Sequence, residues 1–292
     1  MHKILGKEKL AESVYLMRVR APLIAEERQP GQFIILSVDE EYGERIPLTI
    51  ADADPEEGSI TIVFQKVGHT TTLLANLNVG DYIGAVVGPL GSPTHIEKFG
   101  TVVCVGGGIG VAPLHPITAA LKQAGNRIVS IIGARNCELV ILEERMRQLS
   151  DELIVCTDDG SYGRHALVTE PLEEVCRRQP KPDLVVAIGP PLMMKFCAET
   201  TRPFEIKTIV SLNTIMVDGT GMCGGCRVTV GDETKFVCVD GPEFDGHKVD
   251  FDGMINRLQA YREQEREADA TLEQASDHKC RLEKEIGKKE TN

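Results

Sequence analysis

Apolar residues in the N-terminal part of the chain come in short runs that turn residues interrupt. The runs are rich in β-branched and aromatic side chains, and Pro30-Gly31 and residues 55–58 stand between them. Short strands at this spacing favour a small antiparallel barrel over residues 1–97. A Gly- and Pro-rich stretch at 88–93 then predicts a domain boundary. The expected strands are 14–19, 33–38 and 59–64.

The pattern changes between residues 98 and 215, where buried apolar runs alternate with helix-like stretches. Helices are expected at 114–124 and 142–149. Buried strands that alternate with helices predict βαβ units, a parallel sheet and thus an α/β domain over 98–215. A sheet of this kind binds ligands at the carboxyl ends of its strands. The expected strands are 102–105, 128–132, 153–156, 184–188 and 206–212.

Two further segments follow the predicted sheet. Residues 216–250 are rich in Gly, Cys and Asp, which predicts a third compact module. Residues 251–292 have a helical pattern, with Met254, Leu258 and Tyr261 on one face. Charged residues dominate the last part of this segment, so we expect a solvated helix or a frayed tail there.

Composition then narrows the class of protein. The chain has 292 residues with 44 acidic and 32 basic side chains, a formal net charge of −12. This charge argues against nucleic acid or an anionic membrane as the main partner. No apolar run approaches the ~20 residues that cross a bilayer, and the N-terminus lacks the apolar stretch of a signal peptide. Nine cysteines, an odd number, are a poor disulfide framework. We therefore expect a cytoplasmic protein.

Three of the nine cysteines stand close together behind an aspartate. The spacing is Asp-x4-Cys-x2-Cys-x11-Cys, from Asp218 through Cys223 and Cys226 to Cys238. Plant-type [2Fe–2S] proteins use Cys-x4-Cys-x2-Cys and a later Cys. The three thiols fit that pattern, with Asp218 in the first position. The glycines between them let the backbone wrap closely around inorganic sulfide.

Two other interpretations of this cluster stay open. Structural zinc sites take four N or S ligands, often as two Cys pairs, and the loop could also carry unrelated thiols. Only one Cys-x2-Cys pair is present, which favours the iron–sulfur interpretation. An oxygen ligand at Asp218 would alter the reduction potential of the cluster, since potentials depend on the ligands.

Candidate phosphate-binding groups precede the boundary at 88–93. Gly68 allows a tight turn, and Thr70 and Thr71 would offer hydroxyl groups and helix N-terminal amides to a phosphate. The planar guanidinium of Arg45 can bind two oxygens of a diphosphate. Each group also has a plainer interpretation, with Arg45 as a solvated charge and the threonines as a helix cap.

A glycine-rich turn follows the first strand expected in the second domain. Glycines let the backbone approach a diphosphate, and the start of a helix adds partial positive charge. The pattern departs from G-x-G-x-x-G because position 111 is Val, and a tight turn without a ligand is the alternative. The candidates are Gly106, Gly107, Gly108, Gly110, Val111, Ala112 and Pro113.

Other expected strands also end in candidate ligand-binding residues. All of them fall where a parallel sheet presents a ligand. Arg135 could bind a 2′-phosphate or pack on adenine, so NAD(H) and NADP(H) both remain open. The candidates are Gly133, Arg135, Asp158, Asp159, Gly189, Pro190 and Met193.

The order of these motifs resembles the ferredoxin–NADP reductase superfamily. The matching segments are 30–33, 45–49, 68–71, 106–113 and 189–190. The C-terminal cysteine module narrows the resemblance to the electron-transfer subunit of dihydroorotate dehydrogenase and its relatives. Among these, Asp218 in the first ligand position is similar to the small subunits of electron-bifurcating NADH-dependent reduced ferredoxin:NADP oxidoreductases.

The resemblance implies a flavin-binding barrel, an NAD(P)-binding α/β domain and a C-terminal [2Fe–2S] module, with FAD and NAD(H) as further cofactors. It also implies that Thr49 lies near N5 of the flavin. Pro47 and Leu48 stand where the superfamily usually has an aromatic ring, so stacking on the flavin must come from elsewhere. The remaining implied flavin contacts are Ile46, Val63, Phe64 and Gln65.

The implied function is an electron relay between NAD(H), FAD and the [2Fe–2S] cluster. A larger flavin and iron–sulfur subunit would complete a heterodimer and carry NADP(H) and the bifurcating flavin, and ferredoxin would act through that partner. No acid–base residue is predicted, because the cofactors carry the chemistry. Two alternatives remain. One is a subunit of a dihydroorotate dehydrogenase, sulfide dehydrogenase or glutamate-synthase-like complex. The other is a redox sensor or scaffold without hydride transfer.

Overall fold

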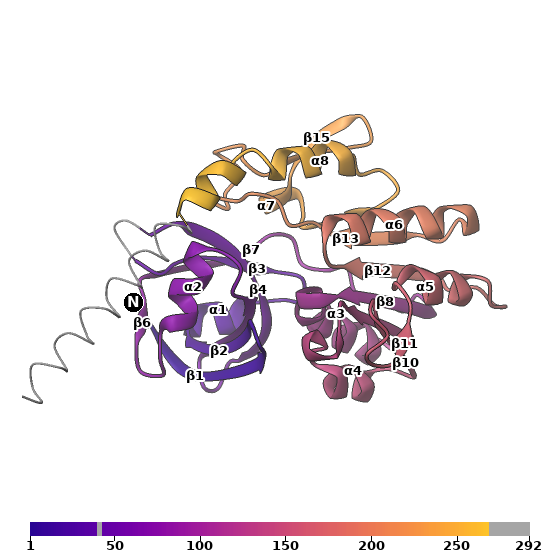
Figure 1. The fold of residues 1–292 in the computed structure, drawn as a ribbon, viewed down its shortest axis with the longest axis horizontal. Coiled ribbons are helices and arrows are strands. Elements are labelled where there is room, and N and C mark those ends of the chain that lie inside the picture. Colours follow the sequence, from indigo (N-terminus) through magenta and orange to yellow (C-terminus); the bar gives the residue numbers. More distant parts are fainter. Residues whose placement is uncertain (40–42, 269–292) are drawn as a thin grey trace, which may run out of the picture.

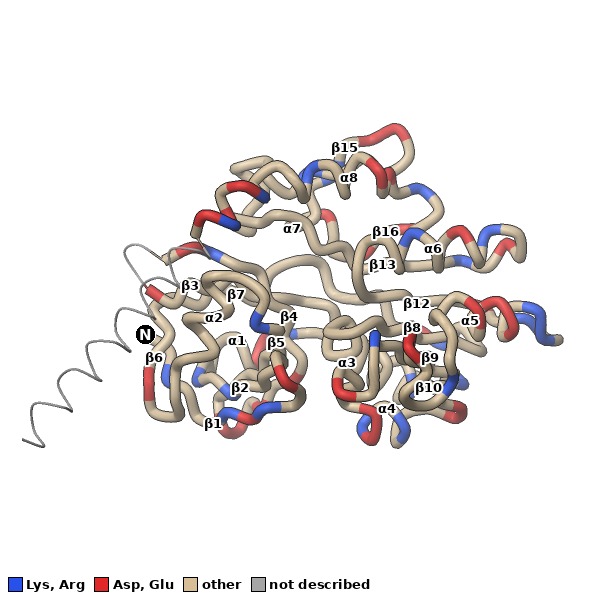
Figure 2. Tube along the Cα trace, viewed as in Figure 1, with Lys and Arg blue, Asp and Glu red and all other residues tan. Residues whose placement is uncertain are grey.

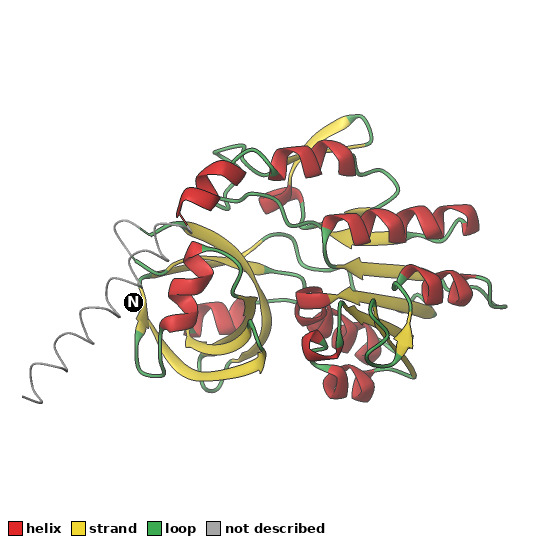
Figure 3. Cartoon of the chain, in the orientation of Figure 1, coloured by secondary structure: helices red, strands yellow, loops and turns green. Residues whose placement is uncertain are grey.

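The computed structural model describes residues 1–39 and 43–268 of the chain. It has an N-terminal barrel, a layered α/β domain beside it, and a C-terminal module that lies over both in the view of Figure 1. Helices lie on both sides of the central sheet in Figure 3. Among the described residues, no helix is both long and apolar enough to cross a bilayer. The predicted tail beyond residue 268 lies outside the described residues.

Seven antiparallel strands form the N-terminal barrel, in the order β6-β1-β2-β5-β4-β3-β7. Only Gly84 separates β6 from β7 in the sequence, so the two edges of the sheet meet and the barrel nearly closes. The barrel and its three expected strands are therefore confirmed. The strands are β1 (His2–Ala11), β2 (Val14–Arg20), β3 (Phe33–Ser37), β4 (Arg45–Asp54), β5 (Ser59–Gln65), β6 (Tyr82–Ile83) and β7 (Ala85–Leu90).

The barrel encloses an apolar core of its own. Alternate side chains of its strands point inward, and Met17, Ile34 and Ile62 are completely buried there. Two short helices, α1 (Pro22–Glu27) and α2 (His69–Asn76), add Ile24 and Leu74 to this core. The packed interior holds β4 and β5 in place as one wall of the candidate site.

The central sheet has the order β11-β10-β9-β8-β12-β13-β16. All neighbouring strands are parallel except the pair β13–β16, so the expected parallel sheet is confirmed with one antiparallel strand added. The chain order reverses at β8, which creates a crevice at the carboxyl ends of β8 and β12. The parallel strands are β8 (Thr101–Gly107), β9 (Arg127–Ala134), β10 (Glu152–Thr157), β11 (Arg164–His165), β12 (Leu184–Ile188) and β13 (Thr208–Ser211).

Helices bury both faces of this sheet. Along β8, Val103 and Val105 belong to the apolar cluster under α5 (Thr169–Cys176) and α6 (Pro191–Thr201). Val102 and Cys104 point the other way, toward α3 (Val111–Gln123) and α4 (Glu143–Leu149). The uninterrupted apolar run thus reflects burial on two sides. Helices α3 and α4 confirm the two expected from the sequence.

The C-terminal module shares a sheet and a core with the α/β domain. Its strand β16 (Glu243–Asp245) pairs with β13, and Phe251 and Met254 join the apolar cluster under α5 and α6. Tyr261 is 56% exposed, unlike the predicted apolar face, because it lies beyond the end of α8. The boundary predicted at residue 216 stays a prediction. The other elements are β14 (Arg227–Val230), β15 (Glu233–Phe236), α7 (Val237–Asp240) and α8 (Phe251–Leu258).

The linker between the barrel and the sheet also contacts the module. The Ser92 amide donates to the Gly241 carbonyl at 2.7 Å, and the Thr94 amide donates to the Pro30 carbonyl at 2.9 Å. The Thr94 hydroxyl donates to Oε1 of Glu243 at 2.6 Å. The barrel, the sheet and the module therefore meet at Thr94. Figure 2 shows charged residues mainly on the outer helices and turns.

Candidate functional site

A large cavity opens where the barrel meets the carboxyl edge of the central sheet. Its volume is about 1260 Å³. Residues of β3, β4 and β5 line one wall, and the ends of β8, β9, β10 and β12 line the other. This is the edge at which the sequence predicted a ligand. The predicted residues that line the cavity are Pro47, Leu48, Thr49, Val63, Gln65, Gly107, Gly108, Gly110, Pro113, Gly133, Arg135, Asp158, Gly189, Pro190 and Met193.

Thr49 lies at the middle of the barrel wall. It pairs with Phe33 in the β3–β4 ladder, and both residues line the cavity. Pro47 and Leu48 extend this wall, so a largely apolar surface surrounds one hydroxyl group. Such a surface suits a flat aromatic ligand with polar atoms along one edge.

Strand alternation divides the predicted flavin contacts on β5. Val63 and Gln65 face the cavity. Phe64 points into the barrel, where it is 1% exposed and its ring stacks on Tyr15 with centroids 5.9 Å apart. Ile46 on β4 packs against the same barrel core. Phe64 and Ile46 thus support the wall from behind and do not line it.

Helix α2 begins at the turn that the sequence predicted. The amide of Gly68 donates to Oγ1 of Thr71 at 3.0 Å, so Thr71 acts as a helix cap, the plainer of its two interpretations. Thr70 is 4% exposed and its hydroxyl donates to the carboxylate of Glu44. Arg45 is exposed. These predicted diphosphate contacts lie outside the cavity lining, and their role stays a prediction.

The glycines of the loop after β8 serve different purposes. Gly108 has a φ of 54°, and a Cβ there would meet no atom within 4 Å, so its backbone faces open space. A Cβ on Gly110 would lie 2.3 Å from the carbonyl oxygen of Ile188, and one on Gly107 would lie 2.2 Å from Sδ of Met193. The loop therefore fits a diphosphate at Gly108, beside the N-terminus of α3. Three predicted residues pack behind it, namely Gly106, Val111 and Ala112.

Arg135 and Asp158 face the cavity from two neighbouring strand ends. Because β9 and β10 pair in parallel, the residues that follow them lie side by side: the Asp158 amide donates to the Ala134 carbonyl at 3.0 Å. The carboxylate of Asp159 accepts from both the hydroxyl and the amide of Ser161, which hold its pKa below the ordinary value. Asp159 shapes the turn, whereas Arg135 and Asp158 face the space for a ligand.

The loop with the predicted cluster ligands begins at Asp218. Its carboxylate accepts hydrogen bonds of 2.8 Å from the backbone amides of Thr220 and Cys223, and these bonds hold the pKa of Asp218 below its ordinary value. The next residue, Gly219, has a φ of 76°, and a Cβ there would lie 2.6 Å from Cδ1 of Leu90. The start of the loop therefore packs directly against the barrel strand β7.

The structure brings two of the predicted thiol ligands into contact. The sulfurs of Cys226 and Cys238 lie 3.2 Å apart, and both side chains are buried. Backbone amides approach two sulfurs: that of Cys238 lies 3.5 Å from Sγ of Cys226, and that of Gly225 lies 3.4 Å from Sγ of Cys223. Hydrogen bonds of this type tune the thiolate ligands of iron–sulfur clusters.

Cys223 is exposed. Within the described part of the chain, no group of three or more His, Cys, Asp or Glu side chains converges as a metal site. The donor set and the N–H···S contacts nevertheless fit a cluster, because two thiols and one carboxylate lie on one glycine-rich loop and the third thiol, Cys238 on α7, contacts Cys226. The assignment of Asp218, Cys223, Cys226 and Cys238 as ligands stays a prediction.

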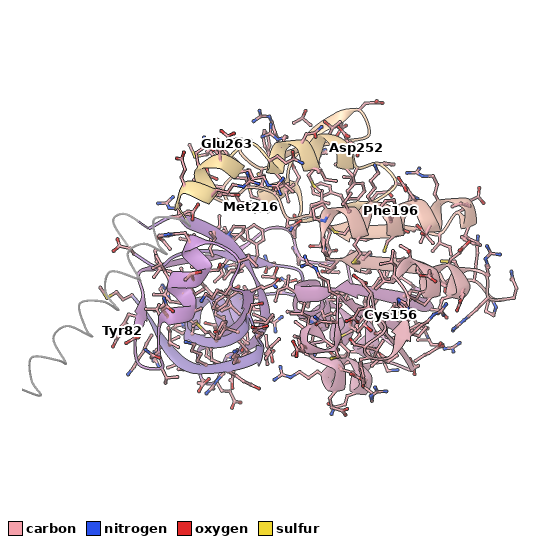
Figure 4. All side chains as sticks on the ribbon, in the orientation of Figure 1. Tyr82, Cys156, Phe196, Met216, Asp252 and Glu263 are labelled. Carbon is pink, nitrogen blue, oxygen red and sulfur yellow. The ribbon has the colours of Figure 1, made fainter. Side chains whose placement is uncertain are left out.

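Sequence reasoning missed part of the cavity lining. Asn213, Met216 and Pro242 line it from segments that flank the predicted cluster ligands. Phe196, labelled in Figure 4, and Phe204 extend the lining between α5 and α6. No local motif marks these residues, since they reach the cavity only through the way the module and the helices pack.

Comparison with known proteins identifies the family. Residues 213–250 match the iron–sulfur cluster binding domain of dihydroorotate dehydrogenase B. The chain is 49% identical to a dihydroorotate dehydrogenase B electron-transfer subunit homolog of Thermotoga maritima, over 91% of this chain and 93% of the relative. This chain belongs to the family of dihydroorotate dehydrogenase B electron-transfer subunits. The electron-transfer subunit of Bacillus caldolyticus is 36% identical, over 82% of this chain and 94% of its own. The domain match confirms the iron–sulfur interpretation of the cysteine module.

Solved structures support the same assignment for this electron-transfer subunit. A chain from a study of flavin-based electron bifurcation, on the structure of an NADH-dependent reduced ferredoxin-NADP oxidoreductase, superposes with a TM-score of 0.88. It is 46% identical, and the match covers 93% of this chain and 98% of that chain. The cytochrome b5 reductase domain of Ulva prolifera nitrate reductase is 17% identical, with a TM-score of 0.59 over 70% of this chain and 93% of its own. That similarity extends to the fold alone.

Proposed function

We propose that this chain takes electrons from NADH and passes them singly to an iron–sulfur cluster, as the small subunit of an electron-bifurcating NADH-dependent reduced ferredoxin:NADP+ oxidoreductase. The observation that carries the proposal is the cavity of about 1260 Å³, with barrel strands on one side and strand ends on the other. An iron–sulfur domain at residues 213–250 adjoins it. The barrel wall would hold a flavin, and the sheet wall would hold a nicotinamide in the same cavity.

The bound FAD, NAD(H) and [2Fe–2S] cluster supply the redox chemistry, in which a flavin mediates between two-electron and one-electron carriers. The chain orients these groups and excludes water. The hydroxyl of Thr49 can donate a hydrogen bond on β4, the middle strand of the barrel wall, next to the apolar side chains of Pro47 and Leu48. Gly108 and the start of α3 would bind the dinucleotide diphosphate. Asp218, Cys223, Cys226 and Cys238 would hold the cluster.

NAD(H) is the nucleotide that this site favours. Asp158 follows β10, the third strand of the sheet, and faces the cavity, where its carboxylate can accept a hydrogen bond from a ribose hydroxyl. The same charge repels a 2′-phosphate. Arg135 lies beside it and can pack on the adenine ring.

A larger subunit would receive the electrons. The relatives in Thermotoga maritima and Bacillus caldolyticus are both described as electron-transfer subunits, or homologs of them. A subunit of this kind needs a partner subunit that accepts the electrons and reduces the second substrate. The bifurcating complex provides a precedent, because one of its chains is 46% identical over 93% of this chain. The family name favours a second candidate, in which the partner is a dihydroorotate dehydrogenase.

The test uses the full chain and its complex, purified without oxygen. The chain alone should contain FAD, iron and sulfide, and NADH should bleach its flavin absorption. A protein that holds the cluster but does not react with NADH would be a sensor or scaffold, and the proposal would be wrong. The complex captured on tagged chain should reduce NADP+ only when NADH and reduced ferredoxin are both present. Reduction of orotate by that complex would instead establish the second candidate.

A further inference from the structure

A thin apolar wall stands between the cavity and the cluster loop. Met216 and Pro242 line the cavity, and each lies close in sequence to a predicted ligand, Met216 just before Asp218 and Pro242 shortly after Cys238. Because an extended chain advances at most ~3.5 Å per residue, the Cα atoms of Met216 and Asp218 lie within about 7 Å of each other. The two proposed cofactor sites therefore share this wall.

Met216 lines the cavity from the segment that leads into the cluster loop. It is 5% exposed and belongs to the same apolar cluster as Phe33, Cys226 and Cys238. Phe33 lines the cavity opposite Thr49 in the β3–β4 ladder. Figure 4 shows Met216 in the region between the module and the barrel. A single thioether therefore lies at the cavity surface, two residues before the first predicted cluster ligand.

The surrounding backbone fixes the thickness of this wall. The amide of Leu212 donates to the carbonyl of Pro242 at 2.9 Å, which ties together the two segments that supply the wall. Gly219 leaves no room for a Cβ, because one would lie 2.6 Å from Cδ1 of Leu90 and 2.8 Å from Cδ1 of Ile35. The segment that carries Met216 therefore cannot move away from the barrel without losing these contacts.

We propose that Met216 is a positioning residue for electron transfer, whose side chain fills the space between the flavin and the cluster and keeps it free of water. This rests on the proposed function. Methionine suits the task, because its flexible and polarisable side chain fills irregular gaps. Removal of a buried side chain leaves a void that the structure closes only in part. Solvent near an iron–sulfur cluster also changes its potential.

The electrons that cross this wall come from NADH. Its hydride brings two electrons and one proton, and a proton from water completes the reduced flavin. The electrons then leave one at a time. Each converts one [2Fe–2S]2+ to [2Fe–2S]+, with two protons released in total, and the cluster is oxidised again by the larger subunit or by added ferricyanide. Met216 takes no part in the hydride step, so the two steps can be measured separately.

The experiment compares Met216→Ala with Met216→Leu and with Met254→Ala in the full chain. Met254 is 2% exposed in the same apolar cluster but does not line the cavity, so it controls for the loss of a buried thioether. NADH is mixed with each protein without oxygen. Flavin bleaching reports the hydride step, and the electron paramagnetic resonance signal of rapidly frozen samples reports reduction of the cluster. The potential of the cluster is titrated in parallel.

Met216→Ala should slow cluster reduction about tenfold, which corresponds to about 1.4 kcal/mol in the barrier, and should slow it far more than it slows flavin bleaching. The cluster potential should shift as water enters. Met216→Leu and Met254→Ala should stay close to wild type. Cluster reduction at the wild-type rate in Met216→Ala, or equal slowing in Met254→Ala, would overturn the proposal. If Met216→Ala loses its cluster, Met216→Val provides the same comparison with a smaller void.

The two proposals fail in different ways. A wild-type chain that binds no flavin or does not react with NADH would contradict the proposed function. A wild-type chain that reduces its cluster normally, with a Met216→Ala variant that does the same, would contradict the role of Met216 alone.

Discussion

The carboxylate of Asp218 accepts a 2.8 Å hydrogen bond from the backbone amide of Cys223, so the first two predicted cluster ligands already contact each other through the loop backbone. The same carboxylate accepts a second bond from Thr220. Asp218 therefore shapes the loop whether or not it binds iron. Two substitutions of Asp218 can therefore be compared, one that changes the atom available to bind iron and one that also removes the hydrogen bonds of the loop.

Asp218→Cys should keep the cluster and change its midpoint potential, because a thiolate would replace an oxygen ligand. Asp218→Ala should lose most of the iron and sulfide, since it removes both the ligand and the loop hydrogen bonds. Iron and sulfide analysis with a potentiometric titration measures both effects, and Asp232→Ala, in the exposed turn between β14 and β15, is the control. An unchanged potential and visible spectrum in Asp218→Cys would show that Asp218 is not a ligand.

The two glycines Gly108 and Gly110 should respond differently to substitution by Ala. Gly110→Ala drives a methyl group into the carbonyl oxygen of Ile188, so we expect a loss of about 1–3 kcal/mol in the free energy of unfolding. Gly108→Ala costs about 1 kcal/mol for its positive φ and puts its methyl group into the cavity. The KM of Gly108→Ala for NADH should rise about tenfold, which corresponds to a loss of about 1.4 kcal/mol in the free energy of binding. Thermal melts and steady-state kinetics with ferricyanide measure the two effects, and an unchanged KM would remove Gly108 from the nucleotide site.

Asp158→Ser should relax the choice of nucleotide. Removal of a carboxylate beside the ribose removes the repulsion of a 2′-phosphate, so the ratio of kcat/KM for NADPH to that for NADH should rise about tenfold, or 1.4 kcal/mol. Asp159→Asn is the control, because the Asp159 carboxylate is already engaged by Ser161. We expect Asp159→Asn to affect both nucleotides equally. If Asp158→Ser and wild type had the same ratio of kcat/KM values for the two nucleotides, Asp158 would not be the residue that selects NADH.

Glu243 should make stability depend on pH. Burial raises the pKa of its carboxyl above the ordinary value, partly opposed by the hydrogen bond from Thr94. As the pH rises, the Glu243 carboxyl loses its proton in the unfolded chain before it does so in the folded chain. The free energy of unfolding therefore falls over the pH range between the ordinary and the raised pKa. The fall amounts to about 1.4 kcal/mol for each pH unit that separates the two pKa values. Glu243→Gln should not show this fall, and should be more stable than wild type above that range.

Urea unfolding of wild type and Glu243→Gln over a series of pH values measures this difference. Glu12→Gln, which is exposed in the turn between β1 and β2, should follow the wild-type curve. Parallel curves for wild type and Glu243→Gln would mean that the buried carboxyl does not contribute to the pH dependence.

Local hydrophobic patterns predicted most strands of the central sheet. They did not predict how the C-terminal module joins that sheet. Strands such as β8 and β12 are buried on both faces, so an uninterrupted apolar run marks each of them in the sequence. Strand β16 has only three residues, and two of them, Glu243 and Asp245, are acidic. Its place in the sheet comes from pairing with β13, a distant segment that no local pattern reveals.

The same distinction holds for the candidate site. Gly108 and Asp158 were predicted because chemistry places such residues at strand ends, and both line the cavity. Met216 and Pro242 were missed, since only tertiary packing brings them there. Thr71 caps α2, and its sequence pattern could not separate this role from phosphate binding, because both uses need a hydroxyl at the start of a helix.

The pairing of β16 with β13 has a consequence for redesign. A free strand edge offers unpaired amides and carbonyls that recruit other chains, and β16 covers that edge with its own backbone, from Ile209 to Ser211. A reductase shortened at residue 215 to remove the metal would uncover this edge, and we expect it to aggregate. An iron-free version would therefore need the four predicted ligands replaced and β16 retained. The C-terminal module would then serve solubility as well as electron transfer.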